Sequence, residues 1–293
     1  MISEKKWTDR LFDLFTYVLL IFLALMCIAP FLHILAVSLS ATAPSMGGFV
    51  KFWPIGFNLE NYRKILGAPA FQSSFLISLE RTLLGTSINM LVLILAAYPL
   101  SKTSQEFKGR NVFMWVFLFA MLFNGGLIPT FLVVRGLGLM DTIWALVLPG
   151  ALQIFSLFLM MNFFRDVPKE LEEAAVIDGA NHWQILYNVY LPISLPALAT
   201  LTLFAAVGHW NAWFDGAIYM TRAENYPLQT FLRTVVVQLD LSRLMVDPNA
   251  LAQLSNRSLK AAQIFVTIFP ILLVYPFLQR YFITGIKLGA IKG

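Results

Sequence analysis

The stretch from Glu170 to Pro192 decides how this chain is organised, because it is a polar segment between two hydrophobic ones. It begins Glu170-Leu171-Glu172-Glu173-Ala174-Ala175-Val176-Ile177-Asp178-Gly179 and ends Leu191-Pro192. Pro168 suits the first turn of a helix, and Asp166 before it is a candidate cap. The glutamates place negative charge near the positive end of the helix dipole, and Gly179 can end the helix in a left-handed conformation. We therefore predict a short, exposed acidic helix outside the bilayer, followed by a turn.

The composition indicates that the rest of the chain lies largely in a membrane. Of 293 residues, 58% are hydrophobic and 13% are charged, and the mean hydropathy is +0.73. A soluble domain carries about twice that charged fraction. The net charge of +5 comes without a basic cluster interleaved with aromatic residues, so it favours a role in membrane topology over nucleic-acid binding. The sequence thus predicts an all-α integral membrane protein.

Six apolar spans stand out, each close to the ~20 residues that a helix needs to cross the bilayer core. Their length and continuity indicate helices, since barrel strands are shorter and alternate in polarity. The predicted spans are Leu14–Val37, Phe75–Leu100, Val112–Val134, Ile143–Phe164, Ser194–Tyr219 and Gln263–Ile283. We therefore expect an N-terminal segment at residues 1–13, a six-helix transmembrane domain at 14–284 with its polar loop at 165–192, and a C-terminal tail at 285–293.

Positive charges predict the orientation of these spans, because Lys and Arg near short loops favour the cytoplasmic side. The clearest indications are Lys5, Lys6 and Arg10 in the N-terminal segment and the turn from Lys102 to Arg110. Both favour a cytoplasmic N-terminus, which places the acidic helix and the C-terminal tail in the cytoplasm as well.

Motifs of several enzyme classes are missing from the sequence. There is no Gly-x-x-x-x-Gly-Lys-Ser/Thr loop to cradle a phosphate and no Gly-x-Ser-x-Gly elbow. His33, His182 and His209 are far apart, and the single Cys27 lies in an apolar run, which argues against a metal site. We expect no catalytic residue, cofactor or metal in this chain, so transport driven by ATP would need another protein to hydrolyse it.

The spacing within the acidic segment resembles the EAA loop of permease subunits of binding-protein-dependent ABC importers. That pattern is Glu173-Ala174-Ala175, three residues, Gly179, nine residues, then Val189-Tyr190-Leu191-Pro192, where the family has Ile in place of Val189. Other segments resemble the carbohydrate-uptake branch, and within it the permeases for complex oligosaccharides and polysaccharide fragments such as alginate or oligogalacturonide. These segments are Pro54–Leu66, Phe123–Thr130, Tyr275–Phe282 and Gly289–Gly293.

The resemblance implies a subunit that moves oligosaccharides or polysaccharide fragments across the cytoplasmic membrane of a bacterium. It implies as partners a second, unlike permease subunit, two cytoplasmic ATPases that bind ATP and Mg, and an external solute-binding protein. Each ATPase would receive one EAA loop. The coupling residues implied for this chain are Glu170, Glu173, Ala174, Ala175, Asp178, Gly179, His182, Trp183, Leu191 and Pro192. Glu173 would face a basic residue of the ATPase, and His182, Trp183, Ile185 and Leu186 would form a second helix and its contact face.

The substrate path has two sets of candidates. Aromatic rings stack on sugar faces and Asn or Asp bind hydroxyl groups, but Trp also marks membrane interfaces, so both interpretations stay open. The candidates are Asn124, His209, Trp210, Asn211, Trp213 and Asp215. Asn124 stands before Gly125 and Gly126, which can break the third span, although small residues also serve close helix packing. Glu80 and Arg81 indicate a charge pair between helices more than a ligand site.

Three other functions stay open. A permease of the same superfamily for another solute is the nearest. A secondary transporter driven by an ion gradient would need intramembrane carboxylates, for which Glu80 and Asp215 are the candidates, and an inverted repeat that the sequence does not show. A membrane assembly subunit that recruits a cytoplasmic partner without transport is the third.

Overall fold

The computed structural model describes residues 7–236 and 257–290, and every regular element in these ranges is a helix. The chain divides into two compact units. The first unit comprises Met1–Ala68 with Thr234–Phe269, and the second comprises Pro69–Arg233 with Pro270–Gly293. Parts of the predicted terminal segments, residues 1–6 with Lys5 and Lys6 and residues 291–293, lie outside the described residues.

The first unit is built on the long apolar helix α1 (Trp7–Ser38), which covers the predicted first span. It also contains α2 (Thr42–Met46), α3 (Glu60–Gly67) and the beginning of α16 (Arg257–Ala290). A small core joins the end of α1 to α16 through Ala36, Val37, Val50 and Ala261. Most of α1 is exposed, and the helix is long and apolar enough to cross a membrane, which suits a surface that faces lipid or another subunit.

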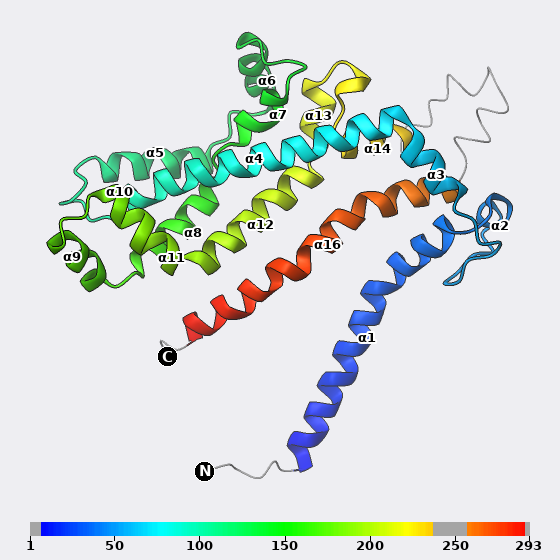
Figure 1. Cartoon of the computed structure of the whole chain (residues 1–293), viewed down its shortest axis with the longest axis horizontal. Coiled ribbons are helices and arrows are strands. Elements are labelled where there is room, and N and C mark those ends of the chain that lie inside the picture. Colours follow the sequence, from blue (N-terminus) through cyan, green and yellow to red (C-terminus); the bar gives the residue numbers. More distant parts are fainter. Residues whose placement is uncertain (1–6, 237–256, 291–293) are drawn as a thin grey trace. The chain divides into compact units, whose positions relative to one another are not determined.

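Helix α4 (Pro69–Ser101) is the axis of the second unit. It packs along α12 (Leu195–Asn211) and α8 (Ile154–Arg165), as Figure 1 shows. Its buried residues recur at intervals of three and four, the spacing of one helix face. This face includes Phe71, Ser74, Ser78, Arg81, Gly85, Asn89, Leu93 and Ala97. Most of these side chains are small or polar, so hydrogen bonds and close approach accompany apolar packing, as is usual between helices in a membrane.

Asn89 illustrates this type of contact. Its amide donates to the carbonyl of Gly150 at 2.9 Å, which ties α4 to the turn η1 (Leu148–Gly150) that follows α7 (Ile143–Val147). Remaining elements of the unit are α13 (Phe214–Tyr219), η3 (Ala223–Asn225) and α14 (Leu228–Val236). Figure 1 shows α9 and α10 at the C-terminal end of α4 and α14 at its N-terminal end.

Several predicted spans are bent, so the prediction of continuous helices is wrong for the fourth and fifth spans, whereas the third span breaks at the glycines that the sequence offers for it. Of the residues described, α1 and α4 alone are long and apolar enough to cross a membrane, and the number of spans rises to at most five if each bent pair counts as one. The third span is α5 (Arg110–Leu122) and α6 (Leu127–Gly136), which meet at 115°. The fourth, built from α7, η1 and α8, bends by 52°. The count of six remains a prediction.

Local sequence explains these bends. Gly126 between α5 and α6 has a φ of +89°, a conformation that a residue with a side chain rarely adopts. Pro149 lies within the turn before α8 and has no N–H to donate to a helix. The predicted fifth span ends early, because α12 stops at Asn211 and α13 begins separately at Phe214. Helix α16 covers the predicted sixth span without a break.

The contact of Gly85 with His209 makes a testable prediction about the packing of α4 on α12. A Cβ atom on Gly85 would lie 2.6 Å from the His209 ring, and that ring is buried. We expect Gly85→Ala to destabilise the protein by about 1–3 kcal/mol through overpacking. Thermal unfolding in detergent measures the effect. The control is Gly136→Ala at the end of α6, where no atom lies within 4 Å, and equal unfolding temperatures for both variants would contradict the prediction.

Candidate functional site

The predicted acidic helix is present as α9 (Lys169–Ile177), but its start differs from the prediction. Pro168 occupies the cap position of α9, and Asp166 instead ends the preceding helix α8. The cap prediction for Asp166 is therefore wrong, because Val167 and Pro168 separate it from the new helix. Glu170 and Glu172 lie in the first turn, where the helix dipole stabilises negative charge.

Gly179 ends α9 as predicted, with a φ of +80°. The N–H of Ala180 donates to the carbonyl of Ala175 at 2.9 Å, and the N–H of Gly179 donates to that of Val176 at 3.0 Å. This pair of bonds is the Schellman arrangement, which satisfies the last carbonyls of a helix and sets the direction of the chain after it. Asp178, at the C-cap, is exposed.

The second short helix, α10 (His182–Ile185), starts from a complete capping box. The side chain of Asn181 accepts from the N–H of Gln184 at 3.0 Å, and the side chain of Gln184 accepts from the N–H of Asn181 at 2.8 Å. The helix continues as η2 (Leu186–Tyr190) and α11 (Leu191–Ile193) before an 83° bend into α12. The angle between α9 and α10 is therefore fixed by hydrogen bonds at both ends of the turn.

The exposed surface of this loop is smaller than the sequence predicts. Glu170, Glu173 and Ala174 on α9 are exposed, as are His182 and Trp183 on α10 and Pro192 on α11. Ala175 and Leu191 are half-buried against the core of the second unit. Ile185 and Leu186 are buried in that core, so their prediction as part of a contact face is wrong: they hold α10 in place from within.

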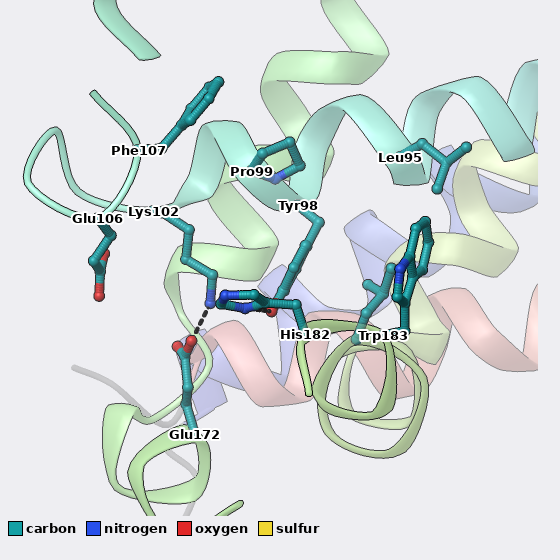
Figure 2. A pocket seen from close by; sticks show the side chains of 10 residues that line it. Leu95, Tyr98, Pro99, Lys102, Glu106, Phe107, Glu172, His182 and Trp183 are labelled. Atoms are coloured by element: carbon teal, nitrogen blue, oxygen red, sulfur yellow. Dashed lines mark hydrogen bonds and ion pairs between the residues drawn. The ribbon is translucent and has the colours of Figure 1, made fainter. Parts of the chain in front are cut away.

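An ion pair at the end of α4 anchors the acidic helix. Lys102 pairs with Glu172, and the side chains are 10% and 17% exposed. The ammonium also donates to the Tyr190 hydroxyl at 2.9 Å, and that hydroxyl donates to the second oxygen of Glu172 at 2.5 Å. Figure 2 shows the pair with Tyr98 and His182 beside it, and the Tyr98 hydroxyl lies 3.3 Å from Nδ1 of His182.

Two hollows lie beside this ion pair. The first, of about 420 Å³, is drawn in Figure 2 and is bounded by the Lys102–Glu172 pair, by Trp183 and by apolar side chains that include Leu95 and Phe107. The second, of about 800 Å³, has Arg110, Arg165, Lys169 and Glu173 among its lining residues. Charged and apolar side chains therefore lie together beside α9.

Glu106 contributes a fixed negative charge to both hollows. It accepts hydrogen bonds from the backbone N–H of Thr103 at 2.7 Å and from the Thr103 hydroxyl at 2.8 Å. These bonds, the backbone one first, hold the pKa of Glu106 below its ordinary value. The carboxylate is thus ionised at neutral pH.

The candidate substrate residues in α12 and α13 mostly contact other parts of the second unit. Arg81, with a side chain 2% exposed, pairs with Asp215 and donates to the carbonyl of Ala212 at 3.1 Å. Arg81 therefore forms a charge pair between helices, but its partner is Asp215, so the predicted involvement of Glu80 is wrong. His209 packs on Gly85.

The tryptophans of this cluster have neighbours of their own. Trp210 is buried and meets Phe75 edge-on with ring centroids 5.8 Å apart, and Arg233 lies over the Trp213 ring at 3.5 Å. Asn211 is exposed. Within the described residues, no group of three His, Cys, Asp or Glu side chains could hold a metal ion.

Asn124 lies apart from that cluster, at the bend between α5 and α6. Its side-chain oxygen accepts the N–H of Gly126 at 2.9 Å, and the residue is exposed. The predicted break of the third span at Gly125 and Gly126 is confirmed. A Cβ atom on Gly125 would have no neighbouring atom within 4 Å, so close packing inside the unit does not explain this glycine.

The chain is similar to known transport proteins along nearly its whole length. Residues 88–288 match the family described as "Binding-protein-dependent transport system inner membrane component". The chain is 40% identical over 286 residues to the polygalacturonan/rhamnogalacturonan transport system permease protein YtcP of Bacillus subtilis, covering 97% of this chain and 99% of that protein. It is 39% identical over 284 residues to Protein LplC of the same organism, covering 97% and 96%.

A solved structure has the same fold. It is the crystal structure of a bacterial ABC transporter involved in the import of the acidic polysaccharide alginate. One of its chains superposes with a TM-score of 0.86 at 34% sequence identity, covering 96% of this chain and 99% of that one.

The Arg81–Asp215 pair yields a prediction about stability. Arg81→Met leaves the Asp215 carboxylate without its partner, so we expect a loss of about 3–5 kcal/mol, whereas Arg81→Met with Asp215→Leu removes both charges and recovers most of it. Thermal unfolding in detergent compares the two variants. The control is Lys64→Met at the exposed Lys64–Glu60 pair, where little change is expected. A double variant no more stable than the single one would show that the charges are not the cause.

Proposed function

The chain belongs to the family of inner membrane components of binding-protein-dependent transport systems, and we propose that it is the transmembrane subunit of an ABC importer for oligosaccharides or polysaccharide fragments. Members of this family are permease subunits without a catalytic site of their own. ATP and Mg would therefore be bound by a partner ATPase, with no cofactor in this chain.

The observation that carries the coupling role is the rigid, exposed geometry of α9 and α10. The Schellman bonds at Gly179 and the capping box at Asn181 fix the turn, while Glu173 and Ala174 stay exposed. A carboxylate beside a small residue on a fixed helix offers a charged contact at short range to an arginine-containing cleft. In this proposal α9 and α10 form the EAA coupling loop that docks on the ATPase.

The assembly that we propose pairs this chain with a second, unlike permease subunit, two ATPases and an external solute-binding protein. Its N-terminus lies in the cytoplasm, on the same side as α9. ATP binding closes the ATPases, the docked helices move with them, and the spans change from inward-open to outward-open. Substrate contacts by Asn124, Asn211 or Trp213 remain part of the proposal.

Acidic oligosaccharides are the cargo class that the relatives favour. One relative bears the name of a polygalacturonan/rhamnogalacturonan permease, and a structural relative takes part in alginate import. Polygalacturonan and alginate are both chains of uronic acids, so the shared chemistry is a sugar chain with repeated carboxylates.

The ion-driven alternative is weakened by the structure. It would need a carboxylate in the membrane that is free to gain and lose a cation or proton. Asp215, one of two candidates, is already paired with a guanidinium that stays charged at all ordinary pH values. Membership of the family of binding-protein-dependent transport systems also argues against an ion-driven transporter.

Charge reversal at the loop tests the coupling role. We expect Glu173→Lys to weaken retention of a co-expressed ATPase at least tenfold, because it places a cation opposite a cationic cleft. Gly179→Pro should do the same, because proline cannot adopt the φ of +80° at this position. Pull-down from detergent extracts measures retention. Glu224→Lys, another exposed acid but outside the loop, is the control, and equal retention by all variants would overturn the proposal.

Uptake assays test the cargo class. Proteoliposomes that contain the complete importer should take up uronic acid oligomers at least tenfold faster than neutral oligosaccharides of the same length. The comparison uses radiolabelled oligomers at equal concentration, with ATP supplied on the side of the membrane where the ATPases lie. Faster uptake of the neutral oligomers would be consistent with the proposed importer function but would contradict the proposal of an acidic cargo.

A further inference from the structure

Glu172 differs from the other glutamates of α9 in what it contacts. Glu170 and Glu173 are exposed, whereas the Glu172 side chain is 17% exposed and both of its carboxylate oxygens have partners inside the chain. One oxygen pairs with Lys102, and the other accepts from Tyr190. On the same helix, Glu170 and Glu173 thus face outward, whereas Glu172 faces the rest of its own chain.

The inward partners are held firmly. The Lys102 ammonium lies 4.5 Å from the Tyr98 ring centroid and 4.4 Å from that of Tyr190, so two aromatic faces stabilise its charge. The Tyr190 ring is buried and meets Tyr98 and Phe164 edge-on, with centroids 5.1 and 5.5 Å apart. The atoms that receive Glu172 therefore have little freedom to move.

Helix α9 makes few other contacts with the rest of the second unit. None of its residues is buried, and Glu172 and Ala175 are its two half-buried ones. Ala175 offers one small apolar contact, which resists sliding poorly. The Glu172 carboxylate, in contrast, makes directional bonds to two groups on different elements, which restrains both the position and the rotation of α9.

We propose that Glu172 is a positioning residue that joins α9 to the end of α4 through Lys102 and Tyr190, so that α4 follows when α9 is displaced. This inference rests on the proposed coupling role of the loop and adds a division of labour within it. Glu173 faces the ATPase, and Glu172 passes the displacement to the transmembrane helix. Because α4 packs along α8 and α12, a movement of α4 would also displace these two helices.

The experiment separates docking from transmission in the complete importer in proteoliposomes. Glu172→Gln and Tyr190→Phe keep the size of each side chain and remove the charge or the hydroxyl. We expect both to retain the ATPase within about twofold of the unaltered protein, while the ratio of substrate-stimulated to basal ATP hydrolysis falls at least fivefold. Glu173→Gln is the matched neighbour, and it should lose retention instead.

A charge exchange controls for misfolding. Lys102→Glu and Glu172→Lys each place like charges together and should lose stimulation, whereas the double variant restores the ion pair and at least half of the stimulation. Restored thermal stability without restored stimulation would show that the pair is only structural and would overturn the inference.

The remaining outcomes distinguish this inference from the proposal beneath it. If Glu172→Gln loses retention like Glu173→Gln, or keeps full stimulation, Glu172 has no separate role, although the loop still docks. If Glu173→Gln retains the ATPase as well, the coupling role of the loop fails, and this inference fails with it.

Discussion

The packing of α4 against α8 and α12 supports both candidate sites. At one level of this interface Arg81 reaches Asp215 on α13, and at its C-terminal end Lys102 reaches Glu172 on α9. Small and polar residues on the buried face of α4, such as Gly85 and Asn89, let its neighbours approach closely enough for these contacts. A displacement of α4 would therefore change the contacts of the substrate-path candidates and also those of the acidic loop.

Two sets of charged residues in the second unit have different environments. Arg81, Asp215, Lys102 and Glu172 are largely shielded from solvent and paired, because an unpaired ion in such surroundings is costly. Glu170 and Glu173 remain exposed on α9 and are available to a partner. This separation explains why a helix with three glutamates can be both anchored to its own chain and open to another protein.

Composition and spacing were sufficient to predict the helical membrane class, the acidic helix and the left-handed conformation of Gly179. Those features are local: hydrophobic runs, dipole-compatible charges and a glycine at a helix end act within a few residues. Gly125 and Gly126 indicated that the third span could break, but the hydropathy pattern indicated neither the bend in the fourth span nor the separation of α13 from α12. Apolar content alone therefore predicted spans that were too straight.

The amino-acid sequence was enough to predict the class of protein and the acidic helix that ends at Gly179. Which charges pair and which face outward depends instead on packing between distant segments. Glu172 meets Lys102 across 70 positions and Tyr190 across 18, and Arg81 meets Asp215 across 134. Neighbouring glutamates on one helix look equivalent in sequence, and only the packing of α9 against α4 and η2 turns one of them inward, where desolvation makes its ionic partner necessary.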